Sequence, residues 1–294
     1  MSIVQILKPR LTELTAGLTV RRLLPSARQR SVGPFVFFDH FGPVELPAHA
    51  NADVGPHPHI GLATVTYLFE GEFIHRDSLG TVQSISPGAV NWMSAGRGIV
   101  HSERTPHQQL AMSKRLHGLQ LWTALPQALE SSDPTFQHVD ASAIPEVTVG
   151  TARVRVLAGS AFGVESPART TSPTLYLDVW LGGGQELLLP ALAEETALYC
   201  PQEELQVDGQ ALPSQQLAVL DTATEVVIGA ERDTRFVVIG GQRLTQQRHM
   251  WWNFVATQPA RIEEAARLWE TDAFPRIPGE TERVQMPRFV SSRT

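Results

Sequence analysis

The regular alternation of short β-forming segments with turn residues is the feature that most limits the folds open to this chain. Runs rich in Val, Thr, Leu, Tyr and Phe occur at 35–43, 62–77, 147–159 and 174–190, and Gly or Pro residues separate them. The chain holds 22 glycines and 21 prolines, enough for the many turns that a multi-stranded all-β protein requires. The sequence therefore predicts an all-β fold.

The strands fall into two similar sets, which predicts two β-barrels or sandwiches in one chain of 294 residues. We place the first domain at residues 1–145 and the second at 146–250. A C-terminal helix and an extended tail that covers the protein are expected at 251–294. Two hairpins are predicted, one within Leu62–Asp77 and one at the Asp-Gly of LQVDGQAL.

The one helix predicted lies in TQPARIEEAARLWETDAF. Thr257 is expected to be its N-cap, and Pro259 falls in the first turn. Helical periodicity places four residues on one face, which we expect to be buried: Ile262, Ala265, Ala266 and Trp269.

Composition argues against several classes of function. The formal net charge of -6 disfavours general affinity for nucleic acid, and neither a basic run nor a DNA-reading helix is recognisable. No segment has the length of a membrane span, and the N-terminus lacks the pattern of a secretory signal. The single cysteine, Cys200, excludes an internal disulfide and favours a reducing compartment. We therefore expect a cytoplasmic protein that binds neither membranes nor nucleic acids directly.

Two pairs of polar residues have the spacing of metal ligands. In a strand, residues i and i+2 point to the same face, so His57 and His59 can direct both imidazoles at one ion. His101 and Glu103 repeat this spacing with one imidazole and one carboxylate. Pro58 between the two histidines cannot donate to a ladder, which predicts an edge strand or a strand end. A barrel can bring both pairs together, which predicts one divalent metal site made of His57, His59, His101 and Glu103.

The ligand types limit the metal without selecting one. Nitrogen and oxygen ligands without sulfur suit iron(II), manganese, nickel, copper(II) or zinc, and related sites with open positions are typical of non-haem iron oxygenases. Glu103 could instead form an ion pair with Arg97 or Arg104, and His101 could be a core histidine. We interpret His75 as a solvated turn residue.

Four stretches resemble the pirin family, a branch of the cupin superfamily: FFDHFGP, HPHIGLATVTYLFEGEFIHRDSLG, SPGAVNWMSAGRGIVHSE and HGLQLWTALP, all within about residues 35–126. The resemblance implies a bicupin, with two antiparallel β-barrels in one chain, usually a monomer. It implies an iron ion in the N-terminal barrel, at positions matching His57, His59, His101 and Glu103. It also implies a second barrel without metal, and no histidine lies between His138 and His249.

The resemblance implies two kinds of function. Several pirins look like quercetin 2,3-dioxygenases, which open a flavonol ring with O2, and we expect this activity first. Glu103 would then accept the flavonol hydroxyl proton while the histidines hold the ion. Other pirins are iron-dependent partners of transcription regulators or metabolic enzymes, so a regulatory protein without its own catalysis is the alternative. Zinc-dependent hydrolysis or isomerisation is a third hypothesis.

Overall fold

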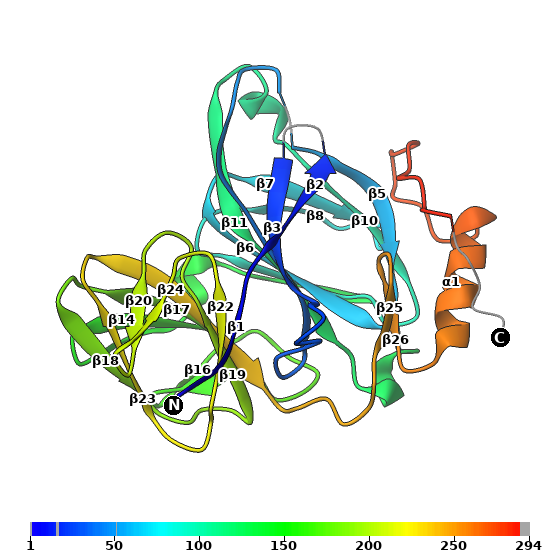
Figure 1. Cartoon of the computed structure of the whole chain (residues 1–294). Helices are drawn as coiled ribbons and strands as arrows, with labels where there is room; N and C mark the ends of the chain where they lie inside the picture. Colours follow the sequence, from blue (N-terminus) through cyan, green and yellow to red (C-terminus); the bar gives the residue numbers. More distant parts are fainter. Residues whose placement is uncertain (1, 16–17, 51, 289–294) are drawn as a thin grey trace. The chain divides into compact units, whose positions relative to one another are not determined.

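The computed structural model describes residues 2–15, 18–50 and 52–288, and most of their regular structure is β-strand (Figure 1). The all-β prediction is confirmed. The chain divides into two compact units, each assembled from separated segments. Unit 1 comprises Met1–Thr12, Val20–His40 and Val139–Leu244, and unit 2 comprises Glu13–Thr19, Phe41–His138 and Thr245–Thr294. The domain limits at residues 145 and 250 stay predictions.

Unit 1 contains a seven-stranded sheet, a four-stranded sheet and a two-stranded ribbon. The seven-stranded sheet has the order β1 (Ile3–Leu7), β22 (Leu217–Leu220), β19 (Glu195–Tyr199), β24 (Thr234–Gly241), β17 (Thr174–Leu181), β14 (Ala152–Ala158) and β13 (Glu146–Val149). The four-stranded sheet has the order β18 (Gln185–Leu189), β23 (Val226–Ala230), β20 (Leu205–Val207) and β21 (Gln210–Leu212). The ribbon pairs β15 (Ser160–Ala161) with β16 (Val164–Glu165).

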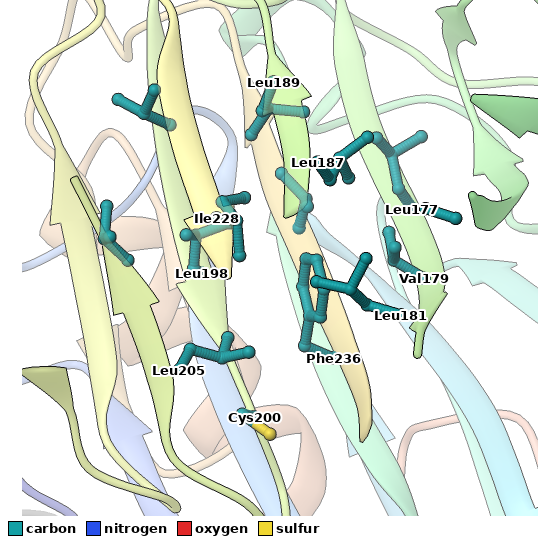
Figure 2. Close-up of a cluster of buried hydrophobic side chains, with 14 of the residues drawn as sticks. Leu177, Val179, Leu181, Leu187, Leu189, Leu198, Cys200, Leu205, Ile228 and Phe236 are labelled. Atoms are coloured by element: carbon teal, nitrogen blue, oxygen red, sulfur yellow. The ribbon is translucent and has the colours of Figure 1, made fainter. Parts of the chain in front are cut away.

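An apolar core joins the two larger sheets of unit 1. Leu177, Val179 and Leu181 recur at every second position of β17, which puts them on one face of the sheet. Figure 2 shows them in one cluster with Leu187 of β18 and Ile228 of β23, from the four-stranded sheet. The alternation of apolar residues therefore explains why two sheets pack face to face here.

Unit 2 holds the second four-stranded sheet and most of the second seven-stranded sheet. The four-stranded sheet has the order β5 (Val54–His59), β10 (Ile99–Arg104), β7 (Phe73–Asp77) and β8 (Val82–Ile85). The seven-stranded sheet has the order β12 (Thr135–Val139), β9 (Val90–Ser94), β6 (Leu62–Glu70), β11 (Lys114–Ala124), β4 (Phe35–Leu46), β3 (Leu18–Leu24) and β2 (Arg10–Thr15). A hairpin of β25 (His249–Trp251) and β26 (Phe254–Ala256) follows later in the chain.

The hairpin predicted within Leu62–Asp77 is wrong. β6 pairs with β9 and β11 in the seven-stranded sheet, whereas β7 pairs with β8 and β10 in the four-stranded sheet. Gly71, between them, has a φ of +91°, and a Cβ there would press on the carbonyl oxygen of Arg115. The Glu-Gly turn thus carries the chain from one sheet to the other. The second predicted hairpin is confirmed, because Asp208 and Gly209 join β20 to β21 with positive φ at both residues.

The C-terminal helix α1 (Pro259–Glu270) begins one residue later than predicted. Its N-cap is Gln258, which makes no side-chain capping bond. Thr257 instead donates its backbone N–H and its hydroxyl to the buried carboxylate of Glu130, at 2.8 and 3.1 Å. The predicted buried face is confirmed: Ile262, Ala265, Ala266 and Trp269 are buried.

The tail after α1 lies along the four-stranded sheet of unit 2. The Val284 N–H donates to the carbonyl oxygen of Pro56 in β5 at 2.8 Å. Glu280 accepts hydrogen bonds from Ser102, at 2.7 Å, and from Arg104, both in β10. The described part of the tail therefore packs on this sheet, residues 289–294 lie outside the described residues, and the full cover expected at 251–294 stays a prediction. Among the residues that the structure describes, no helix has the length and apolar character needed to cross a membrane.

Candidate metal centre

Three adjacent strands of the four-stranded sheet in unit 2 carry pairs of polar residues on one face. β10 lies between β5 and β7. His101 opposes His57 of β5 and Asp77 of β7, and Glu103 opposes His75. Opposed residues share a face of a sheet, as do residues i and i+2. Six side chains therefore project from the same face: His57, His59, His75, Asp77, His101 and Glu103.

The His-Pro-His sequence suits the place that it occupies. β5 is an edge strand, and Pro58 lies opposite Val100 of β10. The edge position predicted from Pro58 is confirmed. An edge strand tolerates a residue without an N–H, and the proline leaves its two histidine neighbours facing the same way.

The structure brings three of the four predicted ligands into one cluster. His57, His59 and His101 each offer a ligand atom, and these atoms lie within 4.8 Å of one another. The three histidines are 8%, 1% and 2% exposed, so solvent reaches the cluster mainly at His57. Nε2 of His59 lies 3.0 Å from Nε2 of His101.

Backbone carbonyls set the tautomers of the two β5 histidines. Nδ1 of His57 lies 2.8 Å from the Gly55 carbonyl oxygen, and Nδ1 of His59 lies 3.0 Å from the Asn253 carbonyl oxygen. A carbonyl oxygen only accepts, so each Nδ1 carries the proton and each neutral ring keeps a lone pair on Nε2. Metal-bound histidines are held in the same way in many proteins.

The β25–β26 hairpin, which supplies the Asn253 carbonyl, lies close to the backbone of Ile60 and Gly61. The Val255 N–H donates to the Ile60 carbonyl oxygen at 3.2 Å. Gly61 has a φ of +67°, and a Cβ there would collide with the carbonyl oxygen of Val255. Glycine at this position therefore allows the β25–β26 hairpin to reach His59.

The cluster fits a divalent ion. Two imidazole nitrogens bound to one ion at a right angle, each about 2.1 Å from it, lie about 3 Å apart. The His59–His101 separation has this value. The donor set contains no sulfur, which suits iron, manganese, nickel, copper or zinc.

Burial keeps the imidazoles neutral, the form that binds metal. Desolvation lowers the pKa of His57 to about 4, although its hydrogen bond to Gly55 opposes the shift. Desolvation, with the repulsion of neighbouring imidazoles, holds the pKa values of His59 and His101 well below their usual range. At neutral pH all three rings therefore have lone pairs available.

Glu103 lies beside the cluster and is not one of its three members. Its Oε1 is 3.8 Å from Nδ1 of His101, and 14% of its side chain is exposed. Burial raises the pKa of Glu103 to about 7, with Arg104 acting in the opposite direction. Arg104 forms ion pairs with Glu280 and Glu282. The roles of Glu103 as fourth ligand and as base stay predictions.

The interpretation of His75 as a solvated turn residue is wrong. His75 lies in β7 and is 5% exposed, and its Nε2 lies 2.9 Å from Oδ2 of Asp77. Its ring stacks on Phe136 with the centroids 4.4 Å apart, while Trp122 meets His59 edge-on at 5.1 Å. The sequence reasoning missed these neighbours because their positions depend on how β7, β11 and β12 are arranged.

We expect the metal-free protein to lose stability as the pH falls from about 6.5 to about 4. The unfolded chain, whose histidines titrate near 6.5, binds protons before the buried imidazoles do, so their contribution is present above this window and lost within it. The effect of Glu103 on stability has the opposite sign, because its raised pKa adds stability as the pH falls from about 7 to about 4.5. The combined effect of the three imidazoles on stability is larger than that of this one carboxyl group. The urea midpoint of chelator-treated protein should fall across this range, and a constant midpoint would contradict the prediction.

Comparison with known proteins places the chain in a family. A family model described as Pirin matches residues 17–123, and one described as Pirin C-terminal cupin domain matches residues 176–275. A pirin-like protein of Caulobacter vibrioides is 42% identical over 254 residues, which make up 85% of this chain and 88% of that protein. The chain belongs to the pirin family.

Two further similar proteins extend the comparison. The pirin of Rattus norvegicus is 32% identical and is matched over 85% of each chain. A crystal structure described as quercetin 2,3-dioxygenase from Acinetobacter baumannii has a TM-score of 0.92 at 33% identity and covers 99% of this chain and 97% of its own. With matches to both pirin models, the predicted bicupin fold is confirmed.

Proposed function

We propose that this pirin-family protein is a non-haem metal-dependent dioxygenase that opens the ring of a flavonol such as quercetin with O2. The convergence of three buried, neutral imidazoles beside a carboxylate carries the proposal. Mixed histidine and carboxylate sites with open positions are typical of non-haem iron oxygenases, so iron(II) is our first choice of metal. The similarity to the Acinetobacter baumannii protein described as quercetin 2,3-dioxygenase supports the substrate class.

The side chains around the cluster have distinct proposed roles. A bound ion would lower the pKa of the flavonol hydroxyl and orient O2. His57, His59 and His101 would hold the ion, and Glu103, partly open to solvent, would accept the hydroxyl proton. The half-buried ring of Phe136, close to His75, offers an aromatic surface to a flat substrate.

The proposal predicts quercetin consumption that depends on the metal. Protein loaded anaerobically with iron(II), manganese, nickel, copper or zinc should, with at least one of them, consume quercetin and O2 together once air is admitted. The loss of quercetin absorbance and the uptake of O2 are measured against protein-free metal solutions. His59→Ala serves as the inactive control, since it removes one proposed ligand.

Two results would overturn the enzyme proposal. One is quercetin consumption no faster than in the protein-free solutions for every metal. The other is equal activity of wild type and His59→Ala, which would assign the reaction to free metal. Retained metal without turnover would instead favour the binding or regulatory role.

A further inference from the structure

A buried histidine–aspartate pair on β7 lies against the cluster of three histidines and has no part in the proposed chemistry. His75 is 5% exposed, and Asp77 is fully buried. Nδ1 of His75 lies 3.4 Å from Nδ1 of His101, within hydrogen-bond reach. Oε1 of Glu103 is 3.8 Å from the same His101 nitrogen, so His75 is the nearer partner.

The hydrogen bonds of Asp77 determine where the protons of this pair lie. Its Oδ1 accepts the backbone N–H groups of Leu79 and Thr81 at 2.9 and 3.0 Å, which holds the carboxylate in place. Its Oδ2 lies 2.9 Å from Nε2 of His75. An ionised carboxylate only accepts, so His75 carries its proton on Nε2 and presents a lone pair on Nδ1. That lone pair can accept the N–H of His101 Nδ1.

We propose that His75 and Asp77 are positioning residues that hold His101 in the tautomer with the proton on Nδ1 and the lone pair on Nε2. This inference rests on the proposed metal centre. His57 and His59 have their tautomers set by the carbonyls of Gly55 and Asn253, and for His101 the His75–Asp77 pair provides the acceptor. All three Nε2 lone pairs are then available to one ion.

Two substitutions of His75 separate positioning from packing. Asparagine places its side-chain oxygen near the former Nδ1 and can still accept from His101, whereas glutamine places its amide near the former Nε2 and keeps only the link to Asp77. We expect His75→Gln and His75→Leu to weaken Co2+ binding by about 10- to 100-fold, and His75→Asn to stay within about threefold of wild type. Competition with a chelator gives the affinity, and the visible spectrum of bound Co2+ reports its coordination.

The outcomes distinguish this inference from the metal centre itself. Wild type that binds no Co2+ would overturn both. Wild-type affinity in His75→Gln, or equal losses in the asparagine and glutamine variants, would overturn the positioning role alone. Nitrogen-15 NMR of the Zn2+-loaded wild type adds a test that needs no variant, and a proton on Nε2 of His101 would contradict the inference.

Discussion

Replacing His101 with alanine will lower the affinity for divalent metal by about 100-fold or more. The loss of a side chain that binds the ion should weaken binding more than the loss of a side chain that only orients such a ligand. His101 is 2% exposed and lies between the histidines of β5 and the His75–Asp77 pair. Metal content after purification without chelators, and competition titration with Co2+, measure the effect.

His107→Ala is the matched control for this experiment. His107 is exposed in a short 3-10 helix, three residues beyond β10, and is not one of the clustered histidines. Removing the imidazole of His107 should leave the metal affinity unchanged. Equal affinities of wild type and His101→Ala would refute the metal centre at this position.

Replacing Glu130 with alanine should lower the free energy of unfolding by about 3–5 kcal/mol, because it leaves the buried guanidinium group of Arg248 without its carboxylate partner. Glu130 is 1% exposed and lies within 4 Å of Arg248 and Arg261. It also accepts the N–H and the hydroxyl of Thr257, just before α1. Urea unfolding followed by tryptophan fluorescence reports chiefly on unit 2, since Trp180 is the only tryptophan outside it.

Glu264→Ala provides the control for the loss of one carboxylate. Glu264 pairs with Arg267 on the outer side of α1, with both side chains more than half exposed. Solvent screens such a pair, so its loss should leave the free energy of unfolding nearly unchanged. If Glu130→Ala lowers the free energy of unfolding no more than Glu264→Ala does, the contacts of Glu130 with Arg248, Arg261 and Thr257 do not anchor α1.

The ligand pairs could be predicted from the sequence because their spacing alone is informative. Residues i and i+2 of a strand share a face whatever the strand pairs with, so His57 with His59 and His101 with Glu103 were recognisable. The buried face of α1 followed in the same way from helical spacing around Ile262.

The residues behind the ligands could not be predicted, since they depend on strand order. A hairpin over Leu62–Asp77 would put His75 near its end, whereas the pairing of β7 with β10 places His75 opposite Glu103. The carbonyl oxygen of Asn253 has no sequence signature, because every residue carries one. Thr257 has the side chain of an N-cap, but a buried carboxylate elsewhere in the chain accepts its hydrogen bonds.

The hydrogen bond between His59 and Asn253 spans 194 positions of the chain. Any attempt to make a minimal metalloprotein from the first half of the gene would keep every predicted ligand and yet lose the group that orients one of them. Chimeras between two relatives face the same constraint. The crossover points should let residues 57–103 and the 249–256 hairpin come from a single parent, so that these two pieces are inherited together.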